Sequence, residues 1–296
     1  MKCFFSFKAS ADKSHNYDQL LKVAVYSALK NTTLQLYCIF DGLPNELTKW
    51  LESKNVTVIF RRSYLYNKLA YITCEKLNNP SLLNIGGGAF LRVEIPAIMQ
   101  EFGYNDRFVL YTDCDVMFQK DVAEGLSRYE PKFFAVAPEN NINSYRLMNS
   151  GVMLMNMPNL QKRDKDFRNY VEKNLESYIP GIGKPVRPNL LVYALSGRVN
   201  YYPAWDQSAY QHYYTQNWLS IPGWDKLPPS FNWKPYWGDS SQADIVHFHG
   251  PKPNQAQLFS SKQVPVHLEP LIDLATPSYF ESSRQWNALL KEEIKG

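Results

Sequence analysis

The chain has 296 residues, of which 45% are hydrophobic and 20% are charged, an ordinary composition for a globular protein with a substantial core. The net charge is +4 and no block of like charges occurs, so we expect no nucleic-acid partner; an anionic substrate or a loose contact with a membrane surface is compatible with this charge. No uninterrupted apolar run reaches the roughly 18 residues of a membrane span, and the apolar start is too short for a signal peptide. We therefore expect a cytoplasmic protein; the alternative is a cytoplasmic protein that associates peripherally with the inner membrane surface.

Strand and helix patterns alternate through the first third of the chain. Apolar runs predict strands at 2–7, 34–40, 56–60 and 107–112, and helical spacing predicts helices at 17–31, 44–53 and 86–103. The last of these helices follows a glycine run and is stopped by Gly103. Strands separated by helices predict an α/β fold with a mostly parallel, Rossmann-like sheet flanked by helices.

The later part of the chain is more irregular. Strands are predicted at 132–138, 150–157 and 243–250, and helices at 159–179 and 277–294. Between 180 and 265 prolines and tryptophans are frequent and regular patterns are few. We expect one domain over residues 1–255 and a C-terminal extension at 256–296 whose helix packs on or beside it.

Two aspartates one residue apart follow the predicted strand 107–112. Asp113 and Asp115 stand at a carboxyl strand end, where open α/β sheets bind their ligands, and alternation turns both side chains to one side. Two hard oxygen ligands on one side can hold a divalent cation that carries phosphates. Roughly one Asp-x-Asp pair is expected by chance in a chain of this composition. Asp164 and Asp166 form a second such pair on a charged helix, and we interpret them as solvated surface residues.

A second set of ligand-type side chains ends the predicted strand 243–250. His247 and His249 alternate onto one face, and the chain continues into Gly250 and Lys252. A single histidine is more often a packed residue than a ligand, but two of them beside a glycine turn and a lysine favour a functional site.

Two further polar stretches are ambiguous by themselves. Asn149, Ser150 and Gly151 lie beside an apolar strand, and they form either a polar edge of a binding site or an ordinary turn. Asp206 and Gln207 lie at the expected start of a helix, where Asp206 is expected to cap the first turn.

A tryptophan-rich segment is the candidate acceptor-binding wall, because apolar sugar faces stack on such rings. An equally open interpretation is a packed cluster. The residues concerned are Trp218, Trp224, Trp233 and Trp237.

Taken together, these stretches resemble the retaining glycosyltransferases of family 8, the group of glycogenin and the bacterial lipopolysaccharide galactosyl- and glucosyltransferases. The matching motifs, in the family's order, are AFLRVEIP, LYTDCD, NSGVMLMN, WDQ, LPPSFNW and HFHGPKP, and they span roughly residues 1–255. The resemblance implies a GT-A fold, a UDP-hexose donor (galactose or glucose), a carbohydrate or glycolipid acceptor, retention of configuration by front-face attack, and a role in surface polysaccharide or lipopolysaccharide synthesis.

The resemblance also implies a role for each matching residue. Asp113, Asp115 and His247 match the ligands of a Mn²⁺ ion, with Mg²⁺ as the alternative; a histidine ligand favours Mn²⁺. The remaining matches are donor-binding residues near the diphosphate and sugar, and a pair beneath the transferred sugar. They are Arg92, Asn149, Ser150, Gly250 and Lys252 for the donor, and Asp206 and Gln207 for the pair.

The chain departs from the family pattern at two points. The loop after the first strand is longer, and Asn16 and Tyr17 are the nearest match to the element that binds the nucleotide base. The identity of that base, uridine in the family, is therefore left open. The last motif is one residue shorter between Gly250 and Lys252, with His249 inside it, so His249 is a candidate to share the role of Lys252.

Two other classes of protein compete with this interpretation. Phosphatases of the haloacid-dehalogenase type also use Asp-x-Asp after an apolar strand, and GDSSQAD at 238–244 matches their late motif, although their catalytic pair lies near the chain start. A non-catalytic sugar-binding protein would explain the aromatic residues, but not the combination of Asp113, Asp115 and His247.

Overall fold

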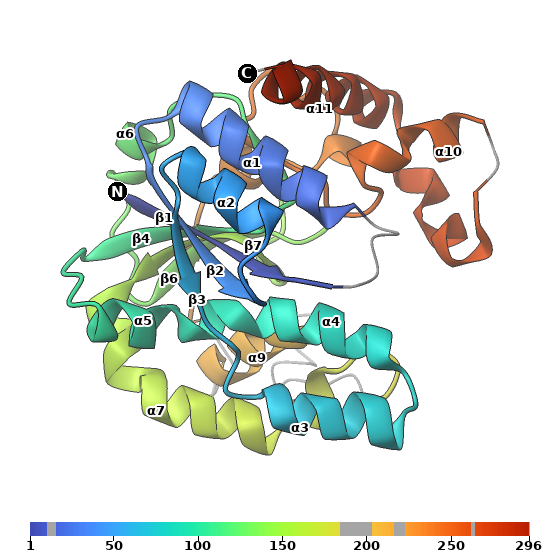
Figure 1. Cartoon of the computed structure of the whole chain (residues 1–296). Coiled ribbons are helices and arrows are strands. Elements are labelled where there is room, and N and C mark those ends of the chain that lie inside the picture. The colour runs from blue at the N-terminus through green and yellow to red at the C-terminus, as the bar shows by residue number, and fades with distance from the viewer. Residues whose placement is uncertain (11–15, 184–202, 216–222, 262–263, 296) are drawn as a thin grey trace.

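The computed structural model describes residues 1–10, 16–183, 203–215, 223–261 and 264–295. Its centre is a seven-stranded sheet in the order β3-β2-β1-β4-β7-β6-β8 (Figure 1). The strands β1, β2, β3 and β4 are parallel, β7 runs antiparallel to β4 and β6, and β8 is parallel to β6. Their bounds are β1 Lys2–Lys8, β2 Gln35–Asp41, β3 Thr57–Phe60, β4 Phe108–Thr112, β6 Phe134–Pro138, β7 Met148–Asn156 and β8 Asp225–Lys226.

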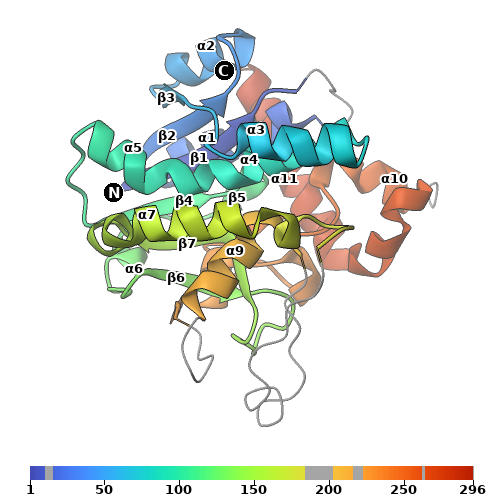
Figure 2. The same ribbon diagram turned by 90° about the horizontal axis from the view of Figure 1, so that it is seen from below.

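Helices cover both faces of this sheet. On one face lie α1 (Tyr17–Asn31) and α2 (Glu46–Ser53); on the other lie α5 (Ile95–Glu101), α7 (Met157–Lys173) and α9 (Trp205–Tyr214) (Figures 1 and 2). The alternation along β1 divides the core between the faces: Phe4 packs with the second helix group, and Phe5 with the first. The predicted mostly parallel α/β sheet is confirmed.

The predicted helix 86–103 begins earlier than its pattern indicated. Helical structure runs from α4 (Pro80–Ala89) through the 3₁₀ segment η2 (Phe90–Glu94) into α5, and the glycine run lies inside it. A Cβ atom on Gly86 would stand 2.5 Å from the Trp205 ring, and one on Gly87 2.7 Å from the Lys8 side chain. The glycines therefore serve close packing rather than a turn.

Among the described residues, this same run is the single helix long and apolar enough by composition to cross a membrane. Its apolar window is 61% buried inside the protein, as expected of a core helix.

Short helices precede and follow the sheet-covering ones. The segment before α4, for which no element was predicted, forms α3 (Tyr66–Ala70) and the π-helix η1 (Tyr71–Lys76). The predicted helix 159–179 divides into α7 and η3 (Leu175–Tyr178), and α6 (Ala123–Leu126) follows the small strand β5 (Val116–Phe118).

The C-terminal part packs against the start of the chain. It contains η4 (Pro229–Asn232), η5 (Pro235–Trp237), β9 (Ile245–His247), η6 (Pro253–Gln255), α10 (Ala256–Ser260), η7 (Val266–Leu274) and α11 (Pro277–Lys295). Helix α11 lies beside α1 (Figure 1), and its Trp286 is fully buried in a cluster with Leu20 and Val23 of α1. The two ends of the chain thus contribute to one cluster.

Candidate active site

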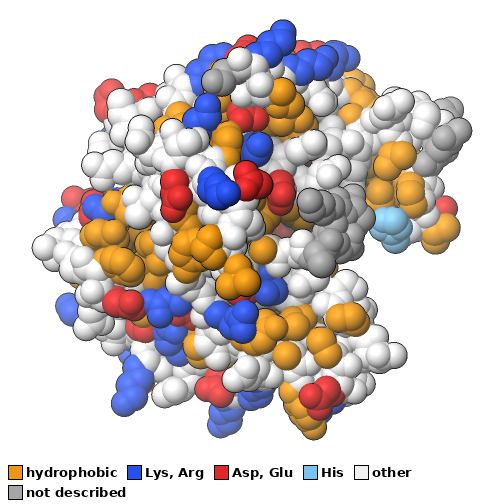
Figure 3. Space-filling model, viewed as in Figure 1, with side chains coloured by type: hydrophobic (Ala, Val, Ile, Leu, Met, Phe, Trp, Pro, Cys, Tyr) orange, Lys and Arg blue, Asp and Glu red, His pale blue; other side chains and the backbone are white. Residues whose placement is uncertain are grey.

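A cavity of about 310 Å³ opens at the carboxyl end of the parallel strands. Its walls come from the ends of β1 and β4, the start of α1 and one side of α4, and they include Lys8, Tyr17, Arg92, Asp113 and Asp115. This is the edge at which open α/β sheets bind ligands. In the space-filling view the surface is hollowed between the C-terminal segments and the helices α3 and α4 (Figure 3).

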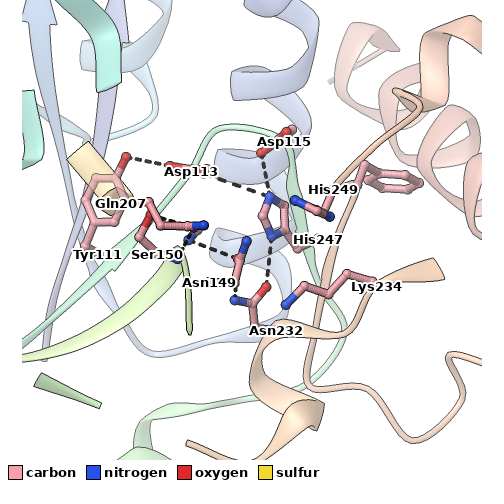
Figure 4. A network of polar contacts seen from close by, with 12 residues as sticks. Tyr111, Asp113, Asp115, Asn149, Ser150, Gln207, Asn232, Lys234, His247 and His249 are labelled. Carbon is pink, nitrogen blue, oxygen red and sulfur yellow. Dashed lines mark hydrogen bonds and ion pairs between the residues drawn. The ribbon is translucent and has the colours of Figure 1, made fainter. Parts of the chain in front are cut away.

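Asp113 and Asp115 line this cavity and His247 lies beside them, so the three residues converge as the sequence motifs predicted. A two-stranded sheet brings them together, since β9 pairs antiparallel with β5 and sets His247 opposite Val116. The Nε2 atom of His247 lies 3.3 Å from Asp115 Oδ1 and 3.9 Å from Asp113 Oδ2. One ligand atom from each residue lies within 4.8 Å of the others (Figure 4).

Each carboxylate has one oxygen held by the protein and the other directed toward His247. Asp113 Oδ1 accepts from Tyr111 Oη at 2.7 Å and Arg92 Nη2 at 3.0 Å, and Asp115 Oδ2 accepts from Lys252 Nζ at 2.5 Å. Burial raises the pKa of Asp115, but the charge of Lys252 outweighs burial and holds that pKa well below its usual range. Asp115 therefore stays ionised.

The donor set fits a divalent cation. Asp115 Oδ1 is buried, and no hydrogen bond reaches it from any described residue. Burial lowers the pKa of His247, which keeps the imidazole neutral and able to act as a ligand. Divalent ions bond to such nitrogen and oxygen ligands at about 2.0–2.2 Å, so ligands of one ion stand about 3–4 Å apart. The separations around His247 Nε2 lie in that range.

Gly151 explains the glycine of the NSG motif. A Cβ atom there would stand 2.2 Å from Cε1 and 2.7 Å from Nδ1 of His247. Strand β7 therefore passes directly beside the imidazole, and only a residue without a side chain leaves room for the ring.

Arg92 joins the metal-type cluster to the pair Asp206 and Gln207. Its guanidinium contacts Asp113, the Ser150 carbonyl oxygen and Asp206, where Nε lies 2.5 Å from Oδ2. Arg92 is only 4% exposed, yet burial is outweighed by Asp206, Tyr111 and Asp113, which raise its pKa, so it stays charged. Burial raises the pKa of Asp206 to about 7, against the opposing effect of Arg92.

The prediction that Asp206 caps its helix is wrong. The N-cap of α9 is Ala204, whose side chain makes no capping bond, and Asp206 lies inside the first turn facing Arg92. The neighbouring Gln207 accepts hydrogen bonds at Oε1 from the backbone N–H of Ser150 at 2.9 Å and from its hydroxyl at 3.2 Å. Both residues are thereby committed to protein partners.

The remaining predicted donor residues lie around this centre. Lys252 contacts Asp115 and the Phe248 carbonyl oxygen, and Gly250 has φ of +101°, which favours glycine. Asn16 occupies the N-cap position of α1 with a left-handed backbone and no side-chain capping bond, and it lines the cavity with Tyr17.

Asn149 and His249 belong to a polar group beside His247. Asn149 is 3% exposed and contacts Glu139, Gly151 and Asn232. His249 places Nε2 3.2 Å from Glu139 and Nδ1 2.8 Å from the Tyr236 hydroxyl. His249 thus lies close to His247, with ring centres 5.7 Å apart, but has separate partners.

The described tryptophans of the candidate acceptor wall do not share one surface. Trp218 lies outside the described residues. Trp224 is 7% exposed and belongs to the main core cluster, which favours the packed alternative for this residue. Trp233 and Trp237 lie edge to face, 5.8 Å apart, and are partly exposed.

Sequence reasoning missed several residues of the site. Tyr111 could have been found, because it alternates onto the same side as Asp113. Lys8 and Asp41 end adjacent parallel strands and form an ion pair at 3.0 Å, with Lys8 lining the cavity. Asn232, which contacts His247, lies in the LPPSFNW stretch to which no role was assigned, and Glu139 carries no local signal.

Comparison with known proteins gives a consistent answer about the fold. No protein-family model and no curated protein sequence matches the chain. Among solved structures it is similar to the glycosyltransferase GlyE of Streptococcus pneumoniae TIGR4, with TM-score 0.56 and 15% identity over 99% of this chain and 63% of GlyE. The chain thus spans less than two thirds of the length of GlyE.

Two further glycosyltransferases show the same likeness. The galactosyltransferase LgtC, solved with donor and acceptor sugar analogs, matches with TM-score 0.52 and 15% identity over 96% of this chain and 100% of LgtC. The bifunctional glycosyltransferase WbbM matches with TM-score 0.52 and 13% identity over 96% of this chain and 51% of its own. The chain therefore has the GT-A fold of these glycosyltransferases.

Proposed function

We propose that the chain is a metal-dependent, retaining hexosyltransferase of family 8, which moves galactose or glucose from a UDP-sugar to a carbohydrate or glycolipid acceptor. The observation that carries the proposal is the convergence of Asp113, Asp115 and His247 at a cavity on the carboxyl edge of a glycosyltransferase fold. The likeness to LgtC, a galactosyltransferase solved with sugar analogs, supports a sugar donor and acceptor.

The residues present suit a diphosphate that departs from a sugar. A divalent ion held by Asp113, Asp115 and His247, Mn²⁺ by preference, would neutralise charge on the leaving diphosphate. Arg92 and Lys252 add two fixed positive charges beside the same cluster, each anchored by one of the two aspartates. Such preorganised charge stabilises a transition state without reorganisation during the reaction.

The surroundings of Asp206 and Gln207 support front-face attack over a covalent sugar intermediate. A covalent route needs a carboxylate available to the anomeric carbon. Asp206 is 2% exposed and paired with Arg92, and the Gln207 oxygen accepts two hydrogen bonds. We therefore assign both residues to positioning Arg92 and Ser150 beneath the transferred sugar.

The wall of the cavity formed by the start of α1 and the end of β1 is the proposed binding site of the donor nucleotide. Asn16 and Tyr17 are the proposed base-binding residues, and Lys8 is an additional hydrogen-bond donor in the same wall. Asn149, Ser150 and Gly250 complete the proposed donor site, and Trp233 and Trp237 remain the proposed acceptor contacts.

We place the enzyme in the cytoplasm, peripherally at the inner membrane face, in surface polysaccharide or lipopolysaccharide synthesis. Apolar side chains exposed on α10 and η7 support a peripheral contact: Leu258 is 38%, Ile272 49% and Val266 78% exposed. We keep residues 1–255 as the catalytic domain and 256–296 as its packed extension.

A donor screen tests the proposal. Purified protein is incubated with Mn²⁺ and each common UDP- or GDP-hexose, and nucleotide release and sugar transfer are measured with and without EDTA. We expect release from a UDP-hexose that EDTA abolishes and Mn²⁺ restores. Phosphate release from simple phosphate esters without any sugar transfer would instead favour the phosphatase interpretation.

The structure offers little support for that phosphatase alternative. Its second motif would need Asp239 and Asp244 near the metal-type cluster. Asp239 is exposed and bonds Ser241, and Asp244 faces Lys120 at 3.9 Å. Neither carboxylate joins Asp113 and Asp115.

A further inference from the structure

The imidazole of His247 has a different partner at each nitrogen. Nε2 faces the two aspartates, and Nδ1 lies 2.9 Å from Asn232 Oδ1 (Figure 4). A neutral imidazole carries its proton on one nitrogen and can bind a metal only through the other. The group that faces Nδ1 therefore competes with Asp115, 3.3 Å from Nε2, for the imidazole proton, and a proton held at Nδ1 leaves Nε2 free to act as a ligand.

Two neighbours fix the orientation of Asn149. The backbone N–H of Gly151, which can only donate, lies 3.1 Å from Asn149 Oδ1. On the other side Asn149 Nδ2 lies 2.7 Å from Glu139 Oε2. Glu139 accepts here because His249 and Lys234 outweigh burial and lower its pKa to about 2. A flipped Asn149 would turn an acceptor to a carboxylate and a donor to an N–H.

Asn149 in turn fixes the orientation of Asn232. Asn149 Oδ1 accepts from Asn232 Nδ2 at 2.8 Å, so the amide nitrogen of Asn232 is committed to that bond. Asn232 must then present its oxygen to His247 Nδ1, and an oxygen can only accept. Asn149 is 3% exposed, Asn232 0% and His247 2%, so bulk water offers no competing partner.

We propose that Asn149 and Asn232 hold His247 in the tautomer with the proton on Nδ1, so that a bare Nε2 faces Asp113 and Asp115. These asparagines are then positioning residues of the metal centre, although neither touches the ion. The proposal rests on the proposed function only in assigning the ion; the tautomer itself is a property of the metal-free protein. It also gives Asn149 a role other than the sugar contact that the family resemblance implies.

The first test reads the tautomer directly. Long-range ¹H–¹⁵N correlation spectra of the metal-free, ¹⁵N-labelled full chain at pH 8.5 distinguish the two neutral forms, and the His247→Gln variant assigns the signals. We expect a protonated Nδ1 and a bare Nε2. A proton on Nε2, or equal populations of both forms, would overturn the proposal, and neither outcome depends on whether a metal binds.

The second test separates a positioning role from a packing role. Mn²⁺ affinity is measured by titration with electron paramagnetic resonance for Asn232→Leu, Asn232→Asp and the wild type. Removing such a partner typically weakens metal binding 10- to 100-fold, and we expect this for Asn232→Leu. Asn232→Asp should stay within about threefold, because a carboxylate also accepts the Nδ1 proton, as in carboxylate–histidine–metal triads.

A packing role predicts the opposite order, because an apolar side chain is tolerated better than a buried charge. Wild-type affinity in Asn232→Leu, or a loss confined to Asn232→Asp, would therefore contradict the proposal. Asn156→Leu is the matched control: Asn156 is 5% exposed on the same strand as Asn149 but bonds the Pro131 carbonyl oxygen, and its loss should leave Mn²⁺ affinity unchanged. If the wild type binds no Mn²⁺, the proposed function fails while the tautomer measurement still decides this inference.

Discussion

At the scale of single residues, the site depends on how the carboxylate oxygens of two aspartates are shared between protein cations and His247. Asp113 and Asp115 each give one oxygen to a protein cation, which leaves the other oxygen facing His247. The motif residues were visible in the sequence because strand alternation and strand ends are local patterns. The partner residues Glu139 and Asn232 could not be found in this way. Asn149 and Asn232, for example, are 83 positions apart, and a contact over that separation leaves no local pattern in the sequence.

Gly151→Ala tests how closely the strand must approach His247. The new methyl group would lie 2.2 Å from the imidazole, which is buried and cannot move into solvent. We expect at least a tenfold loss of Mn²⁺ affinity in a titration, with the circular dichroism spectrum of a folded protein. Unchanged Mn²⁺ affinity would contradict the proposed close approach of β7 to the His247 imidazole.

Lys234 supplies a prediction about pH. Its side chain is fully buried and donates to the Pro138 carbonyl oxygen at 2.8 Å. Burial lowers its pKa from 10.5 to about 7, against the opposing charge of Glu139. The unfolded chain therefore takes up a proton at higher pH than the folded chain, so stability falls as the pH falls from about 10 toward 7.

We expect denaturant unfolding of the wild type to show this loss, on the order of 2–4 kcal/mol between pH 10 and pH 7. Lys234→Met should flatten the curve in that window. Equal slopes for both proteins would mean that Lys234 does not titrate as its burial requires.

At the scale of elements, the position of α9 relative to α4 sets the place of Asp206 and Gln207. The Trp205 ring packs over Gly86, and Trp205 itself has φ of +53°, an uncommon conformation for a bulky residue. Such conformations persist only where the surroundings determine them, and this one directly precedes Asp206.

Gly86→Leu should therefore displace the start of α9. We expect donor turnover to fall more than tenfold, because Asp206 no longer holds Arg92. Gly88→Ala in the same helix is the control, since its Cβ meets Lys8 at an ordinary 3.6 Å, and it should keep the fold and gain about 0.5–1 kcal/mol of stability. Equal turnover in both variants would remove the proposed link between α4 and Asp206.

Several elements followed directly from the sequence, and the failures have physical causes. The helix predicted at 17–31 is observed as α1 (Tyr17–Asn31), because apolar spacing and its boundaries agree. The start of α4 was missed because glycines usually end helices, whereas here they admit Trp205 and Lys8. The antiparallel direction of β7 was not predictable, since alternation does not encode strand direction.

At the scale of the whole molecule, α11 joins the end of the chain to its start. It packs on α1, where Lys30 pairs with Glu292 at 2.6 Å, and it also contacts α2, where Trp50 Nε1 donates to Glu293 at 2.6 Å. The buried Trp286 shares a cluster with Phe248, which lies next to His247 in the chain. Helix α11 therefore contributes to the packing beside the metal-type cluster.

Trp286→Ala measures the contribution of this contact. Truncating a fully buried tryptophan typically costs about 3–5 kcal/mol, and we expect that loss in the free energy of unfolding. Trp286→Phe should cost less because it keeps most of the apolar contact. A cost below about 1 kcal/mol for the alanine variant would mean that α11 packs only loosely.

The most direct test of the central claim compares the two Asp-x-Asp pairs of this chain. Asp113→Asn/Asp115→Asn removes the proposed metal ligands, and Asp164→Asn/Asp166→Asn makes the same change on helix α7, where Asp164 bonds Arg168. We measure Mn²⁺-dependent turnover of the UDP-hexose for both variants and the wild type. The account predicts at least a hundredfold loss for the first variant and less than a twofold change for the second; retained turnover in the first, or an equal loss in both, would contradict it.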